Sequence, residues 1–333
     1  MQNATHIARL VLLVMVGLAV AGFRDDQSVL APNAAEAGRI AHMSWLLFIG
    51  GAVILVAVMT LVAIALVAPA GWRRWLRAEK TVIAGGVIFP TLTLTVLLVY
   101  GLTLTRAGEI GYSGVAPLEI AVSGERWWWR VTYTNADGQR FESANEVRLP
   151  VNREVRLVLS SPDVIHSFWV PRLAGKIDMI PGHTTFLRLK AARAGVSRGQ
   201  CAEYCGGPHA LMSFKVVSLE PAAYEQWLQE ASGPAREPQS ERERRGKQLF
   251  LSSGCGACHS VRGTDARGRV GPDLTHVGGR LTLAAAVLDN NAEAFGRWIA
   301  HNQEIKPGNL MPPFKDFSDE ELRALSVYLA SLR

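Results

Sequence analysis

The sequence has 333 residues, enough for two or three domains. Its hydrophobic fraction is 49% and its charged fraction only 19%, a balance that favours a membrane portion. The formal net charge of +6 is modest for this length, and no basic run with interleaved aromatic residues indicates nucleic-acid binding. The four cysteines form two close pairs in metal-like contexts, which leaves none for a structural disulfide framework.

The N-terminal third contains three apolar runs. The first, residues 10–21, follows Arg9 and ends in small residues, which predicts a signal peptide over residues 1–21. A third membrane helix is the alternative, but this run is short for one. Residues 45–68 and 81–104 are each long enough to cross a hydrocarbon core of about 30 Å. We therefore expect a transmembrane hairpin over residues 40–106, kinked at Pro90 in its second helix.

Charge in the hairpin connection predicts its orientation. Residues 69–80 carry Arg73, Arg74, Arg77 and Lys80 against a single acidic residue, Glu79. The positive-inside rule places this connection in the cytoplasm. Everything after the hairpin then lies on the outer side of the membrane, and a signal peptide gives the same orientation.

The segment from 112 to 230 changes to β-branched and aromatic residues with short turns. Apolar residues alternate with polar or small ones over residues 118–122, 127–133, 155–159 and 187–189. Several short alternating strands predict a β-sandwich or barrel. Pro221 is expected to open a short closing helix.

Soft metal ligands gather in residues 201–212 of this segment. Cys201, Cys205, His209 and Met212 fall within twelve residues, and thiolate, thioether and imidazole together suit copper. A single-copper electron-transfer site uses one Cys, so the second Cys allows two thiolates to bridge two coppers. One more imidazole is needed, and His166 is favoured over the competing His183. A Cys201–Cys205 disulfide would account for the thiols but not for His209 and Met212.

This region resembles subunit II of the haem–copper cytochrome c oxidases. The matching stretches are SGERWWWRVTY, DVIHSFWVP, KIDMIPG and CAEYCGGPHALM. The resemblance implies an all-β, cupredoxin-like Greek-key sandwich with a dinuclear copper A centre. It also implies that the two cysteines bridge both coppers. One copper would be completed by His166 and Met212, and the other by His209 and the backbone carbonyl of Glu203.

The same resemblance assigns further roles. The side chain of Glu203 would reach a magnesium or manganese ion at the contact with subunit I, and Asp178 would face that subunit. Electrons would enter copper A through Trp127, whereas alternation along the strand predicts that Trp129 belongs to the core. One departure stands out: Ile83 lies in the neighbourhood where family members often carry a Glu that helps proton uptake.

Residues 231–240 are rich in Ala, Ser and Pro and predict a flexible linker. In the following segment, 241–333, Cys255, Cys258 and His259 form the Cys-x-x-Cys-His signature of covalent c-type haem attachment, with His259 as an iron ligand. Met311 is the only Met of this segment and lies in a Pro- and Gly-containing loop, so it is the expected second axial ligand. His276 and His301 are the alternatives.

The last segment also has recognisable helix signals. Ser240 and Ser318 each precede a Glu by three residues, which predicts a capping box at the start of two helices. The segment resembles an all-α class I cytochrome c. That resemblance implies that Gly246 and Phe250 of the first helix pack near Tyr328 of the last.

Together these features predict the electron-transfer subunit of a membrane-bound, proton-translocating cytochrome c oxidase. A c-type cytochrome or an upstream respiratory complex would reduce the haem, which would pass electrons to copper A. From there they would reach subunit I, accompanied by subunit III, where oxygen is reduced to water. The expected location is the bacterial inner membrane, with both cofactor domains on the periplasmic side. The alternatives are a relay to a nitric oxide reductase and a non-enzymatic copper- and haem-binding protein; the copper ligands argue against a quinol oxidase subunit.

Overall fold

The computed structural model describes residues 26–110 and 116–333. The signal peptide predicted at residues 1–21 lies outside the described residues. The chain divides into two compact units, one over residues 36–116 and one formed by the residues before and after it.

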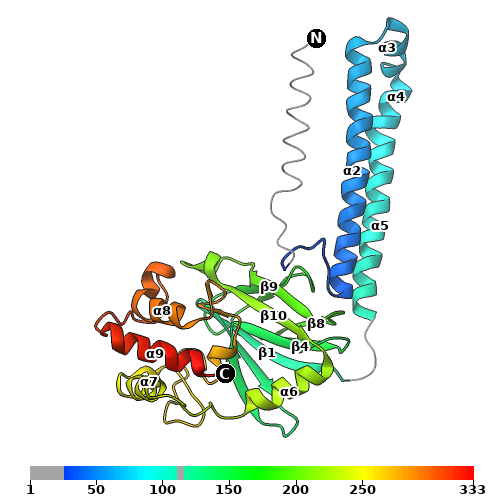
Figure 1. Ribbon diagram of the computed structural model, residues 1–333. Coiled ribbons are helices and arrows are strands. Elements are labelled where there is room, and N and C mark those ends of the chain that lie inside the picture. Colours follow the sequence, from blue (N-terminus) through cyan, green and yellow to red (C-terminus); the bar gives the residue numbers. More distant parts are fainter. Residues whose placement is uncertain (1–25, 111–115) are drawn as a thin grey trace. The chain divides into compact units, whose positions relative to one another are not determined.

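The smaller unit is a pair of long helices (Figure 1). Helix α2, Ala35–Val67, is followed by the short helix α3, Ala70–Leu76. The return run consists of α4, Glu79–Ile83, the π-helical turn η1, Ala84–Ile88, and α5, Phe89–Ile110. Both long helical runs are apolar and long enough to cross a membrane, and their large apolar side chains point outward.

The irregularity expected at Pro90 takes the form of the π-helical turn η1 just before it. Proline lacks a backbone N–H and its ring crowds the preceding turn of a helix. A single wider turn absorbs this conflict while the chain stays helical. The second helix therefore continues through Pro90 and is not broken there.

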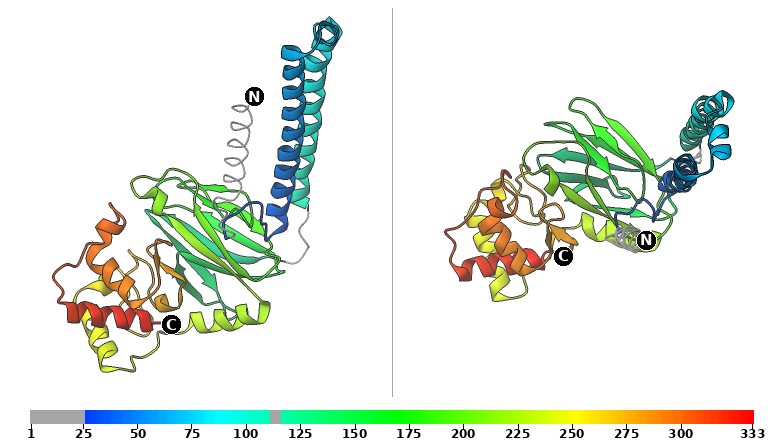
Figure 2. Two further views of the ribbon diagram at one scale, coloured as in Figure 1. Left: turned by 45° about the horizontal axis from the view of Figure 1, so that its top comes forward. Right: turned by 90° about the horizontal axis from the view of Figure 1, so that it is seen from above.

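The larger unit begins with a β-sandwich of two five-stranded sheets. One sheet has the order β3-β2-β1-β5-β8 and the other β4-β10-β9-β6-β7. Figures 1 and 2 show the strands of this sandwich in green and cyan. Neighbouring strands are antiparallel except for the parallel pairs β1–β5 and β4–β10. The bounds are β1 Leu118–Glu125, β2 Trp128–Thr134, β3 Arg140–Ala144, β4 Glu146–Pro150, β5 Val155–Ser160, β6 His166–Trp169, β7 Ile177–Met179, β8 Thr185–Leu189, β9 Gly195–Cys201 and β10 Ser213–Leu219.

The alternation in the sequence corresponds to the inner faces of these sheets. Four of these side chains are at most 1% exposed: Ile120, Val122, Leu157 and Leu159. They belong to one core cluster that also includes aromatic residues of the other sheet. Helix α6, Pro221–Ser232, closes the sandwich and has proline in its first turn, as predicted.

The helical part of this unit packs three helices around its own core. Helix α7, Glu241–Ser252, lies against α9, Asp319–Ser331, and α8, Ala292–Ile305, also contacts α9. The capping boxes predicted at Ser240 and Ser318 are both present. The connecting region holds the short elements η3, Cys255–Ala257, η4, Val277–Gly279, β11, Thr282–Leu283, and β12, Leu288–Asp289.

The segment predicted to be a flexible linker is hydrogen-bonded in the structure. The guanidinium of Arg262 donates to the carbonyls of Ala231 and Gly233, and the amide of Ala235 donates back to the carbonyl of Arg262. Composition alone did not reveal this because the partner lies outside the segment. The start of the linker is therefore tied to the helical part.

Candidate copper and haem sites

Three strand ends bring the predicted copper ligands together. His166 opens β6, Cys201 ends β9, and Met212 immediately precedes β10. Strand β9 pairs with both β6 and β10, so all three residues lie at the same end of these neighbouring strands. The short 3-10 helix η2, His209–Leu211, lies between the second cysteine and Met212. His166 and Met212 are fully buried.

The two cysteine sulfurs are 3.7 Å apart and lie at the centre of this cluster. The Sγ of Cys201 is 3.8 Å from Nδ1 of His166 and 3.2 Å from the carbonyl oxygen of Glu203. The Sγ of Cys205 is 3.4 Å from Nδ1 of His209 and 3.8 Å from Sδ of Met212. Each sulfur thus has one neighbour from each of the two copper ligand sets implied by the resemblance, the arrangement that two bridging thiolates require.

This donor set fits copper chemically. Both cysteines are free and buried. Their thiolates and the thioether of Met212 are ligands that copper prefers. Their mutual hydrogen bond lowers the pKa of Cys201 to about 3 and raises that of Cys205 above its usual value. Among the described residues, His166, Cys201 and Cys205 form the group whose ligand atoms all lie within 4.8 Å of one another.

Asp163 supports this site, although no pattern in the sequence singles it out. Its Oδ1 is 2.9 Å from Nε2 of His166, which leaves Nδ1 of that ring facing the cysteine sulfur. Its Oδ2 accepts the backbone N–H of Arg126. Partial burial raises the pKa of Asp163, but the hydrogen bonds from His166 and the backbone outweigh it and lower the pKa. A carboxylate in this position fixes the orientation of a metal-binding histidine.

The other candidates of the sandwich lie apart from the sulfurs. His183 is exposed in a turn after β7. The side chain of Glu203 is 43% exposed, and its carboxylate lies 3.6 Å from Nζ of Lys176, which also approaches Asp178. Trp129 is fully buried in the core, as predicted.

Trp127 lies in the turn before β2, is half-buried and packs against the core that contains Trp129. Its indole Nε1 donates to the backbone carbonyl of Cys205 at 2.9 Å. Its ring also sits over Gly206, where a Cβ would come within 3.3 Å of it. The ring of Trp127 therefore packs directly on the loop that contains Cys205 and Gly206.

A second site is a cavity in the helical part. Cys255, Cys258, His259 and Met311 all line it, whereas His276 and His301 do not. Nδ1 of His259 donates to the carbonyl of Pro272 at 2.8 Å, which leaves Nε2 free for a metal. Most of the remaining wall is apolar, as haem requires, and includes Phe250, Val277, Leu283, Phe295, Ile299, Leu325 and Leu329.

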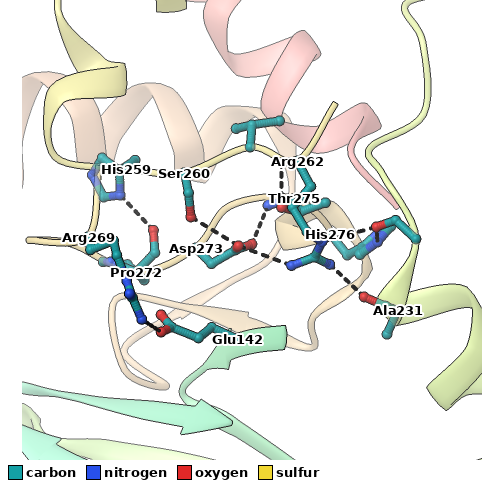
Figure 3. A network of polar contacts seen from close by, with 12 residues as sticks. Glu142, Ala231, His259, Ser260, Arg262, Arg269, Pro272, Asp273, Thr275 and His276 are labelled. Atoms are coloured by element: carbon teal, nitrogen blue, oxygen red, sulfur yellow. Dashed lines mark hydrogen bonds and ion pairs between the residues drawn. The ribbon is translucent and has the colours of Figure 1, made fainter. Parts of the chain in front are cut away.

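A polar network secures the loop that follows His259 (Figure 3). The carboxylate of Asp273 accepts from Ser260 Oγ, Arg262 and the backbone amide of Thr275. Arg262 extends the network to Ala231 of α6. Because Asp273 directly follows Pro272, this network also holds the carbonyl that orients His259.

The sandwich supplies one wall of the same cavity. Arg126, Trp127, Trp128 and Asn145 line it together with the cysteines and Met311. The ring of Trp127 therefore contacts the copper loop on one side and borders the cavity on the other.

Comparison with known proteins agrees with this division of the chain. Residues 134–219 match the family described as cytochrome c oxidase subunit II, periplasmic domain, and residues 243–333 match the cytochrome c family. Subunit 2 of cytochrome c oxidase from Bacillus subtilis is 31% identical over 263 residues, which cover 74% of this chain and 73% of that protein. The chain belongs to the cytochrome c oxidase subunit 2 family. All predicted copper ligands lie within the first matched range and all predicted haem ligands within the second.

Two further relatives of this subunit 2 chain match it over shorter stretches. Cytochrome c oxidase subunit 2 of Alkalihalophilus pseudofirmus is 41% identical over 214 residues, which cover 64% of this chain and 61% of the relative's length. The crystal structure of the periplasmic domain of subunit II of cytochrome oxidase from Bradyrhizobium japonicum is 32% identical, with a TM-score of 0.34. It covers 36% of this chain and 96% of that one.

Proposed function

We propose that this chain is the electron-transfer subunit of a membrane-bound haem–copper cytochrome c oxidase. The observation that carries the proposal is the position of Trp127 between two sites. Its indole donates to Cys205 in the cluster of copper ligands, and its ring borders the cavity lined by Cys255, Cys258, His259 and Met311. Copper A and haem c, when bound, would supply one-electron carriers on the two sides of this side chain.

The residues of the chain would hold these carriers in a rigid ligand set. Cys201 and Cys205 would bridge the coppers, with His166, His209, Met212 and the carbonyl of Glu203 completing the ligand sets. Burial of both sulfurs limits the access of water, and the hydrogen bond that His166 Nε2 donates to Asp163 limits movement of this ligand. His259 and Met311 would ligate the haem iron, and Pro272 orients His259. A rigid ligand set suits electron transfer because little has to move between the two oxidation states.

The partners follow from the same proposal. Electrons would arrive at the haem from a c-type cytochrome or an upstream respiratory complex, and leave copper A for subunit I, with subunit III in the same complex. The chain would lie in the bacterial inner membrane with both sites on the periplasmic side, anchored by α2 and α5. The exposed carboxylate of Glu203, which shares Lys176 with Asp178, is our candidate magnesium or manganese ligand at the contact with subunit I.

The test is to purify the chain with its membrane partners and measure metal content and activity. We expect about two copper ions and one haem per chain, with a pyridine-haemochrome spectrum of the c type. The complex should consume oxygen when supplied with a reduced cytochrome. A chain with one copper or none would overturn the copper A assignment, and nitric oxide reduction without oxygen uptake would identify a different terminal enzyme.

A further inference from the structure

Lys306 is a charged residue buried between the two parts of the larger unit. It follows α8 in the helical part and is only 3% exposed. Its Nζ donates to three backbone carbonyls: Trp127 at 2.6 Å, Leu211 at 2.9 Å and Ala284 at 3.3 Å. An ammonium group has three N–H donors. The three carbonyls therefore satisfy all of them.

Two of these carbonyls connect Lys306 to the sandwich next to a candidate copper ligand. Trp127 and Leu211 belong to the sandwich, and Leu211 directly precedes the copper ligand candidate Met212. Lys306 itself begins the loop that leads to Met311, the haem ligand candidate. We propose that Lys306 is a positioning residue that locks the haem-binding part onto the copper-binding part, an inference that rests on the proposed electron-transfer function.

A neighbouring loop strengthens this junction. Ala284, Ala285 and Ala286 all have positive φ angles, between 56° and 66°, which non-glycine residues rarely adopt. The carbonyl of Ala284 accepts from Lys306, and that of Ala285 accepts from the backbone amide of Ser213 in the sandwich. Hydrogen bonds to the helical part thus flank Met212 on both sides, through Leu211 and Ser213.

Other contacts between the two parts range from an exposed ion pair to a hydrogen bond at Glu146, which is only 3% exposed. The guanidinium of Arg269, whose side chain is 78% exposed, pairs with Glu142 at 2.6 Å. Arg148 donates to the carbonyl of Gly279, and Glu146 accepts the backbone amide of Leu281. Exposed ion pairs contribute little and are screened by salt, whereas a buried charge that loses its partners is strongly unfavourable.

The lock has a consequence for access to Trp127. In the docked arrangement, the carbonyl of this residue is bonded to Lys306 and its ring borders the haem cavity. An external cytochrome would therefore have to displace the haem-binding part in order to reach Trp127. Loosening the lock should slow transfer within the chain and speed transfer from outside it.

The experiment uses the full chain loaded with copper and haem. Lys306→Met keeps an unbranched side chain of similar length but removes every donor. Lys315→Met is the matched control, since Lys315 lies in the same part of the chain, is 61% exposed and pairs with the exposed carboxylate of Glu304. Two rates are measured: the first-order transfer from photoreduced haem to copper, and the second-order reduction of copper by added soluble mitochondrial cytochrome c.

We expect the first-order rate of Lys306→Met to fall about tenfold to a hundredfold. Its second-order rate should rise, and the optical spectra of haem and copper should be unchanged. Lys315→Met should match the wild type in both rates. Unchanged rates in Lys306→Met would refute the lock. A fall in both rates, or loss of either cofactor, would show that Lys306 serves only folding and would equally overturn the proposal. Failure of the wild-type chain to bind copper and haem would instead count against the proposed function.

Discussion

At the scale of single residues, the site depends on side chains that reach past the ligands themselves. Asp163 is the clearest case. Its Oδ1 accepts from Nε2 of His166, and its Oδ2 accepts from the backbone N–H of Arg126, directly before Trp127. Trp127 is the second case. Its indole N–H donates to the carbonyl of Cys205, and its backbone carbonyl accepts from Lys306.

Replacing Asp163 with Asn should weaken copper binding. The amide is nearly the same size but lacks the charge that orients the His166 ring. Loss of such an outer partner typically lowers metal affinity by about 10–100-fold. Competition with a copper chelator measures the change, and the haem spectrum should stay constant. Asp178→Asn is the control because that carboxylate is exposed and pairs with Lys176. Equal affinities for both variants would mean that packing alone orients His166.

Replacing Trp127 with Phe should slow electron transfer from haem to copper about tenfold. The ring is smaller and loses the hydrogen bond to Cys205, while all ligands remain in place. Flash photolysis measures the rate. Trp128→Phe is the control, since Trp128 lines the same cavity but stacks with Arg130. If both variants slow transfer to the same extent, Trp127 has no special role.

At the scale of elements, helices α7 and α9 pack closely against each other. Gly246 permits it, because a Cβ there would lie 2.2 Å from the carbonyl oxygen of Ala324 and 2.6 Å from Cβ of Tyr328. The helical core around Phe250 and Tyr328 is built on this approach.

Replacing Gly246 with Ala should therefore destabilise the helical part. Helix propensity alone would favour alanine by about 1 kcal/mol, but overpacking against a backbone carbonyl costs about 1–3 kcal/mol or more. Thermal unfolding followed at the haem Soret band should show a lower midpoint. Gln248→Ala, at an exposed position of the same helix, should have little effect. A midpoint at or above that of the wild type would show that α9 can shift to accept the methyl group.

Local patterns predicted the fold class and several of its elements, and they place most of the candidate copper ligands in one stretch, for a physical reason. Cys201, Cys205, His209 and Met212 lie in one short stretch, so their spacing alone reports a shared ligand cluster. Alternation in the strands and the two capping boxes are equally local. Lys306 differs, because its partners are backbone carbonyls, and one of them, Trp127, is 179 residues away. Carbonyls leave no trace in residue identity, so nothing in the sequence could reveal this contact.

Two segments differ from their predicted structure for the same reason. The segment 231–240 has the composition of a flexible linker, yet Arg262 outside it binds its carbonyls. Trp127 fits the alternation of a strand that includes Trp129, yet β2 begins one residue later and leaves Trp127 in a turn. In both cases, tertiary contacts override a local preference.

At the scale of the whole molecule, charge supports the contact between the sandwich and the helical part. Glu142 accepts from Arg130 within the sandwich and from Arg269 of the helical part. Burial raises the pKa of Glu142, but the hydrogen bonds from Arg269 and Arg130 outweigh it and lower the pKa below its usual value of 4.5.

Acid should therefore weaken this contact in a defined direction. A carboxyl whose pKa is lowered by folding stabilises the folded state fully above its unfolded pKa, and this stabilisation is lost as the pH falls through the folded pKa. Urea unfolding followed at the Soret band, at pH 6 and at pH 4, should show a loss of stability on acidification. Glu142→Gln should start lower at pH 6 and lose less. An equal loss in both proteins would assign the acid sensitivity to other carboxyls.

The shared wall of the haem cavity also bears on how the protein is assembled. Arg126, Trp127, Trp128 and Asn145 of the sandwich close one side of the space that Cys255 and Cys258 face. That wall narrows the approach for a large flat porphyrin. We therefore expect covalent attachment to come first, on a helical part that still stands away from the sandwich. Docking of the helical part onto the sandwich would follow as the last step of maturation. A chain without haem would then stay undocked, and a chain with haem would be docked.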